Sequence, residues 1–250
     1  MPSNFETGHA KNVSHFESLI SFCKGYGSKY NPSREALKIA NLQTQHTNAE
    51  TSLDDVKEQK KDFDNATNTR KDTFNPLKKL STRIVNALDA TEATAATVDD
   101  AKTINRKIQG SRAENKPEPP PLKEGEATST IEDKTISVSQ QSYDQQIEHF
   151  ASLIKIVASE PTYKPNEDDL TIVSLNKLLG NMRTTNKAVI DANTDADNSR
   201  LNRNKLLYAE PNGLVPIALD VKKYVKSVYS TTSAEYKQVS NLEFKTPDGL

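Results

Sequence analysis

Polar residues that recur at fixed spacing are the first candidates for chemistry in this sequence. Two aspartates, one asparagine and one arginine occur within a short segment, and the same four residues recur 133 positions later. A di-metal carboxylate site in a helical bundle would require Glu-x-x-His motifs on two core-facing helices, and the recurring set contains none. The recurring set consists of Asp62, Asp64, Asn65, Arg70, Asp195, Asp197, Asn198 and Arg203.

Two interpretations of this recurring polar set stay open. Asp62 and Asn65 are three residues apart and share one face of a helix, whereas Asp64 points elsewhere. In the first interpretation the set is a belt of salt bridges and hydrogen bonds between antiparallel helices. In the second it is a patch, present twice, on which a protein partner docks.

The sequence contains no established catalytic, phosphate-binding or metal-binding motif. It has no P-loop, no Gly-x-Gly-x-x-Gly, no His-Glu-x-x-His and no Gly-x-Ser-x-Gly. His46 and Glu50 have the spacing of an exposed helical pair. His15 and His149 each precede a phenylalanine, and they are either a paired pH-sensitive or ligand-binding position or helix-boundary residues inherited by duplication. We therefore predict no catalytic residue, no cofactor and no metal site.

Composition and charge exclude several other classes of function. The formal net charge is −1, so nucleic-acid binding by bulk electrostatics is not indicated. The one cysteine, Cys23, rules out an intrachain disulfide and falls on an apolar stripe, where we expect a buried small hydrophobic residue. No apolar run approaches the roughly 20 residues of a membrane span, and the N-terminus lacks the pattern of a secretory signal. We therefore expect no transmembrane segment and, by default, a cytoplasmic protein, with non-classical export as the open alternative.

An internal repeat organises the sequence. The segment that begins at His15 recurs from His149, and with a shift of 133 the positions from Tyr30 to Arg70 are identical at 12 of 41 places. Shared apolar spacing alone does not require polar identities such as Asn48 with Asn181. The pattern predicts two tandem copies of one unit.

A proline-rich segment separates the two copies. It includes Pro117 and three consecutive prolines from Pro119 to Pro121, which are incompatible with a helix and typical of an extended tether. We predict a first helical repeat at 1–110, a linker at 111–135 and a second helical repeat at 136–250.

One long helix dominates each predicted copy. Apolar residues alternate by three and four positions from Ile39 to Leu77, and the same register recurs from Ile172 to Leu207. Ser33 and Asn166 are the expected N-caps of these helices. The seam becomes polar in its second half, at Lys60, Thr67, Asn193 and Arg200.

Shorter amphipathic segments surround the long helices. One ends at Gly25–Gly27 and its counterpart ends before Pro161. A third helical region follows each long helix, with Thr97 as the expected cap of its second part. We predict an all-α protein, an elongated antiparallel helical bundle built from two tandem three-helix units.

The leading functional hypothesis is a non-catalytic helical scaffold that binds a protein partner or a second copy of itself. The polar half of each seam would then set pairing rather than stability. The alternative is a membrane-acting helical bundle, such as one component of a pore-forming toxin. Its only apolar segment of note is Gly213–Leu219, which is short and contains a proline.

Overall fold

The computed structural model describes residues 4–110 and 141–247, with side chains from Gly8 onward in the first range. Within these ranges the chain is helical and contains no β-strand, which confirms the predicted all-α class. The α-helices are α1 (Asn4–Gly25), α2 (Ile39–Phe74), α3 (Leu77–Asp89), α4 (Ala95–Gln109), α5 (Tyr143–Ser159), α6 (Ile172–Tyr208), α7 (Leu214–Tyr229) and α8 (Ala234–Ser240), with short 3-10 turns η1 (Gly27–Lys29), η2 (Glu35–Leu37) and η4 (Asp168–Leu170).

The chain divides into two compact units that do not follow the sequence repeat. The first unit contains the residues up to Asp64 together with those from Asp191 onward, and the second contains Asn65–Ile190. Each unit therefore takes helices from both the first half of the chain (residues 4–110) and the second half (residues 141–247). The predicted division at 1–110, 111–135 and 136–250 describes the sequence repeat and stays a prediction, and the linker lies outside the described residues.

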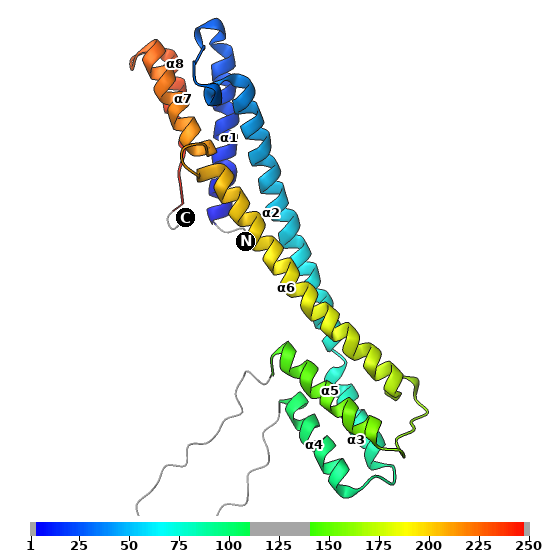
Figure 1. The fold of residues 1–250 in the computed structure, drawn as a ribbon. Helices are drawn as coiled ribbons and strands as arrows, with labels where there is room; N and C mark the ends of the chain where they lie inside the picture. Colours follow the sequence, from blue (N-terminus) through cyan, green and yellow to red (C-terminus); the bar gives the residue numbers. More distant parts are fainter. Residues whose placement is uncertain (1–3, 111–140, 248–250) are drawn as a thin grey trace, which may run out of the picture. The chain divides into compact units, whose positions relative to one another are not determined.

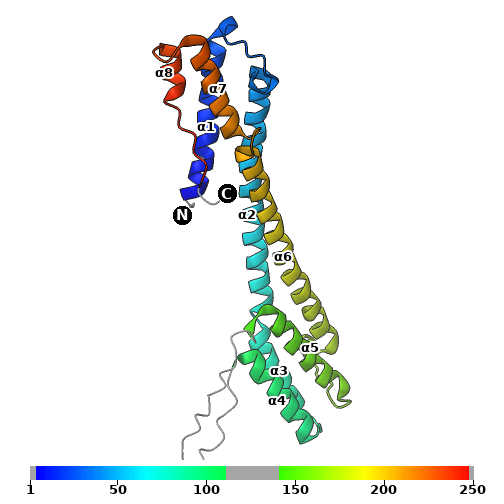
Figure 2. The same ribbon diagram turned by 60° about the vertical axis from the view of Figure 1, so that its left-hand side comes forward.

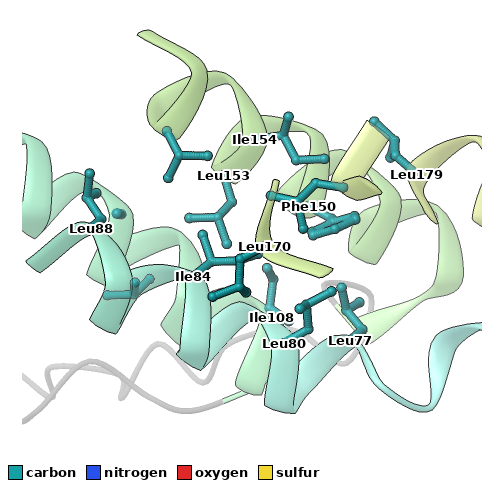
Figure 3. Close-up of a cluster of buried hydrophobic side chains, with 14 of the residues drawn as sticks. Leu77, Leu80, Ile84, Leu88, Ile108, Phe150, Leu153, Ile154, Leu170 and Leu179 are labelled. Carbon is teal, nitrogen blue, oxygen red and sulfur yellow. The ribbon is translucent and has the colours of Figure 1, made fainter. Parts of the chain in front are cut away.

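The second unit is built around α3, α4 and α5. In Figures 1 and 2 these three helices lie side by side, and α4 packs against both of its neighbours. Side chains from all three meet in one buried cluster with the η4 turn and the start of α6 (Figure 3). The cluster includes Leu77, Leu80, Ile84, Leu88, Ile108, Phe150, Leu153, Ile154, Leu170 and Leu179.

The first unit has its own core, in which α1 packs against α7 and α8. Phe16 and Leu19 of α1 are fully buried, as are Val221 and Val225 of α7. The apolar segment Gly213–Leu219 begins α7, and its side chains from Leu214 to Ala218 are buried. Its hydrophobicity is therefore explained by packing within the core.

The two long helices are confirmed at 36 residues for α2 and 37 for α6. The predicted seam is the buried face of both helices, and it is interrupted where polar residues were expected, at the exposed Lys60 and Asn193. Buried seam positions on α2 and α6 are Leu42, Ala49, Val56, Phe74, Leu175, Leu179, Met182, Asn186, Val189, Ala196, Arg203 and Leu207.

The long helices begin later than the sequence suggested, so the expected N-caps Ser33 and Asn166 were wrong. A 3-10 turn, η2 or η4, precedes each helix and buries one leucine, Leu37 or Leu170. The carbonyl of that leucine accepts a hydrogen bond from a buried tyrosine hydroxyl. The distances are 2.7 Å from Tyr30 to Leu37 and 3.0 Å from Tyr163 to Leu170.

The third helical region of each half is divided into two separate helices, so the described part of each half has four α-helices where three were expected. In the first half the break lies between α3 and α4. Thr94 is the N-cap of α4, because its side chain accepts a hydrogen bond from the Thr97 amide at 3.2 Å. In the second half Ser233 caps α8 in the same way, through the amide of Tyr236.

Pro76 joins α2 to α3 with little interruption. Its backbone is helical, with φ of −73°, and its carbonyl accepts a hydrogen bond from the Leu80 amide at 2.9 Å. A proline fits the first turn of a helix because its missing N–H has no helical partner there. The two helices therefore follow each other directly, with only Asn75 and Pro76 between them.

Candidate functional site

The residues of the recurring polar set do not converge on one site. Asp62 and Asp64 of α2 belong to the first unit with Asp195, Asp197, Asn198 and Arg203 of α6, whereas Asn65 and Arg70 belong to the second unit. Each unit therefore holds a separate part of the set.

In the first unit, one part of the set lies in a shallow groove between α2 and α6. Asp195 and Asn198 are exposed on α6, and Asp55 and Gln59 face them from α2. Ser199 and Asn202 complete the lining. The groove thus combines two carboxylates with three side-chain amides and one hydroxyl, a set of groups that favours a cationic or hydrogen-bond-donating partner.

The two aspartates of the recurring set that form ion pairs in the first unit, Asp64 and Asp197, are paired within their own helices. Asp64 lies 2.8 Å from Lys60 Nζ, four residues earlier on α2. Asp197 lies 2.7 Å from Arg200 Nη1 on α6 and also accepts a hydrogen bond from Asn193. Pairs at this spacing stabilise an individual helix by a few tenths of a kcal/mol, about 0.2–0.5. They do not join α2 to α6.

Arg203 is the buried member of the set. Its side chain is 4% exposed, and its Nε and Nη2 atoms donate to Asn204 Oδ1 at 3.1 and 2.9 Å. A buried guanidinium requires acceptors around it because desolvation of an unpaired charge is costly. Arg203 is therefore part of the internal packing of the first unit rather than of the exposed groove.

In the second unit, Arg70 belongs to a polar network that connects three helices. Its Nη1 donates to Asn186 Oδ1 at 3.1 Å, and its guanidinium carbon lies 4.0 Å from the centre of the Tyr143 ring. Asn186 in turn donates to Asp144 at 2.7 Å. This network joins α2, α5 and α6 through polar side chains, which is the kind of contact that the belt interpretation expected. Asn65 is exposed on α2.

A second polar cluster, which no sequence pattern predicted, lies in the first unit between α1 and the end of α6. His9 and Asn12 are 2% and 3% exposed. His9 Nδ1 lies 2.5 Å from the Tyr208 hydroxyl, to which Asn12 also donates at 3.2 Å. Asn12 then exchanges two hydrogen bonds with the Lys245 backbone. His9 and Tyr208 are nearly 200 positions apart in the sequence, so no local pattern predicts this cluster.

The segment after α8 is held against the first unit by side chains of α1 and α7. His15 Nδ1 donates to the Glu243 carbonyl at 2.7 Å, and its ring meets Phe244 edge-on. Lys222 donates to the carbonyls of Ser240 and Leu242, and burial lowers the pKa of its amine. These contacts are structural, because each one satisfies a backbone carbonyl.

His149, the counterpart of His15, has a different environment. It lies inside α5, so it is not at a helix boundary, and its Nε2 atom is buried without a hydrogen-bond partner. Burial lowers its pKa, and the positive charge of Lys107 lowers it further. The two recurring histidines therefore do not form a paired site.

An exposed ion pair of the second unit joins Arg83 of α3 to Asp169 of η4. The pair is bidentate, with Nη2 and Oδ1 3.1 Å apart. The hydrogen bonds from Arg83 lower the pKa of the Asp169 carboxyl. An exposed pair of this kind orients two elements and contributes little stability.

The expected burial of Cys23 is confirmed, at 1% exposure. Burial raises the pKa of its thiol to about 12. Because the thiolate is the reactive form, this side chain is a poor nucleophile at neutral pH.

Within residues 4–110 and 141–247, no group of three or more His, Cys, Asp or Glu side chains is arranged to hold a metal ion. His46 Nδ1 lies 3.3 Å from Glu50 within α2, as the helical spacing predicts. None of the described helices is both long and apolar enough to cross a bilayer. No family model matches this chain, and no curated protein or solved structure is detectably similar to it.

Proposed function

We propose that this protein is a non-catalytic helical scaffold that binds a protein partner through the polar groove between α2 and α6 in the first unit. The observation that carries the proposal is the convergence of polar groups from two helices, half-buried on α2 and exposed on α6. Asp55 and Gln59 come from α2, and Asp195, Asn198 and Asn202 come from α6. The membership of Asp195 and Asn198 in the recurring set supports a docking role.

The chemistry of the groove indicates the character of the partner. Its two carboxylates favour lysine or arginine side chains, and its amides can donate and accept hydrogen bonds. The Asp197–Arg200 pair lies outside the groove on the same helix and offers a matched control, because its removal changes polar residues without changing the groove.

Photo-crosslinking tests this proposal directly. A photoreactive residue replaces Asn202 in the groove in one protein and Asn193, outside the groove, in another. Both are exposed to extract from the source organism. A partner that crosslinks from position 202 and not from 193 is expected. Equal crosslinking from both positions, or none from 202, would overturn the proposal.

Substitution then measures the contribution of the groove to binding the captured partner. The double variant Asp195→Ala, Asn198→Ala is expected to weaken binding tenfold or more, because central interface contacts each contribute about 1–2 kcal/mol. The control Asp197→Ala, Arg200→Ala should bind as the parent does. Circular dichroism verifies that both variants keep their helices.

We also infer that the two halves of the chain descend from one duplicated unit. Support comes from shared local structure at matched positions. Phe16 and Phe150 are both fully buried, and the tyrosine-to-leucine hydrogen bond occurs once in each half. Sequences of related proteins in which only one half is present would test this inference.

A further inference from the structure

Both hydrophobic cores of this protein are built across the two halves of the chain. In the first unit, Leu19 from the first half and Val221 from the second half are fully buried in the same cluster. In the second unit, Ile84 from the first half and Phe150 from the second half are fully buried in one cluster. Each half on its own would expose the apolar faces that the other half covers.

Specific polar contacts also join the halves and define how they fit together. In the first unit, the ring of Tyr30 in the first half of the chain contacts the ring of Tyr224 in the second half. The polar pairs include Arg34–Asp220 at 2.6 Å, Arg83–Asp169 at 3.1 Å, Gln45–Asn212 at 2.9 Å and Tyr26–Glu235 at 2.9 Å. The fit between the halves is therefore specific rather than a general hydrophobic association.

The covalent connection between the halves begins and ends at neighbouring points. Gln141 Nε2 donates to the Lys107 carbonyl at 2.8 Å, and α4 packs along α5. The 30 residues at 111–140 therefore join two points that are already in contact. A chain of this length spans up to about 100 Å when extended, so the same connection can reach a neighbouring molecule.

We propose that the two halves are complementary binding partners, so that a second copy of this chain can supply either half in an exchanged dimer. The interface in that dimer is the one already present in the monomer, which is the condition for exchange at low energetic cost. The proposal does not rest on the polar groove or on its partner.

Complementation between two damaged full-length chains tests the exchange. One chain carries Leu19→Asp with Cys23→Ser, so that its first half cannot complete the first unit. The other carries Val221→Asp, so that its second half cannot. An exchanged dimer contains one undamaged fold, made of the intact first half of one chain and the intact second half of the other. The remaining Cys23 is buried again in that fold.

The two chains are unfolded in denaturant and refolded separately or together. The Val221→Asp chain alone should react readily with a thiol reagent. After joint refolding at equal concentrations, most of the Cys23 should react at least tenfold more slowly with the thiol reagent. Light scattering should show that this protected Cys23 belongs to a species of twice the chain mass. A matched control replaces the first chain by one that carries Val225→Asp with Cys23→Ser, which leaves both second halves damaged and should give no protection.

Two results would overturn the proposal. One is a jointly refolded sample of monomer mass in which Cys23 stays reactive. The other is equal protection in the control mixture, because that would show that protection does not require an intact second half. If Val221→Asp alone leaves Cys23 protected, Val225→Asp is used in that chain and Val221→Asp in the control.

Discussion

At the scale of single residues, two matched tyrosines contribute to the turn that precedes each long helix. Tyr30 and Tyr163 are both buried, and each directs its hydroxyl at a leucine carbonyl in a 3-10 turn. The hydrogen bond satisfies a backbone acceptor that the turn leaves outside the helix. The identity of these residues was visible in the sequence, whereas their role depends on a turn that the helical pattern did not predict.

Removing either hydroxyl should destabilise the protein. Tyr30→Phe and Tyr163→Phe each keep the ring and leave a buried carbonyl without its partner, at an expected cost of about 1–2 kcal/mol. Urea unfolding followed by circular dichroism measures the change. If one variant is destabilised and the other is not, the two turns are not equivalent.

His149 should make the protein less stable in mild acid. Burial lowers its pKa in the folded chain, so the folded state favours the neutral imidazole. The contribution to stability is therefore complete above the unfolded pKa of about 6.5 and is lost as the pH falls below it. In His149→Asn, the decrease in the free energy of unfolding between about pH 8 and pH 5 should be smaller. An unchanged pH profile would exclude this role.

At the scale of elements, helix ends were harder to predict than helix faces. The buried stripe of α2 and α6 follows from the three-and-four spacing of apolar residues, which requires only that one face be covered. The caps depend on which hydroxyl reaches which amide. Thr94 and Thr97 illustrate this, because either is a suitable residue type and only Thr94 accepts from a backbone N–H.

Substitution of these two threonines distinguishes the cap from its neighbour. Thr94→Ala removes the hydrogen bond to the Thr97 amide and should cost about 1 kcal/mol. Thr97→Ala keeps that amide and loses only the contact between the two hydroxyls, so its effect should be smaller. Thermal unfolding ranks the two variants, and a larger loss for Thr97→Ala would place the cap where the sequence first suggested.

At the scale of the whole molecule, each core depends on residues that are distant in the sequence. Phe16 and Phe150 occupy matched positions in the repeat, and each is fully buried in a different unit. Both units contain part of α2 and part of α6. The sequence repeat and the spatial units are thus two different divisions of the same chain.

Truncation of these phenylalanines should therefore damage either unit to a similar extent. Phe16→Ala and Phe150→Ala each leave a cavity, with an expected cost of about 3–5 kcal/mol. Leu201→Ala is the control, because Leu201 is 66% exposed and its loss should change stability by less than about 0.5 kcal/mol. Denaturant unfolding measures all three. A near-neutral Phe150→Ala would show that the second core is not needed for stability.

Sequence analysis alone was enough to predict the helical class, the two long helices, the buried face of each and the burial of Cys23. These properties follow from local periodicity and residue type, which act over a few turns of helix. It also identified Asp195 and Asn198 as part of a recurring polar set, although not the residues of α2 that face them.

The identity of the helices that share a core, and of the polar residues that meet, became known from the three-dimensional structure. His9 and Tyr208 are 199 positions apart and lie in one buried cluster, while Asp64 and Arg70 are six apart and belong to different units. Periodicity defines an apolar face but not its partner, because any complementary face can bury it. Pairing is selected by the packing of the complete chain, in which each half covers the apolar surface of the other.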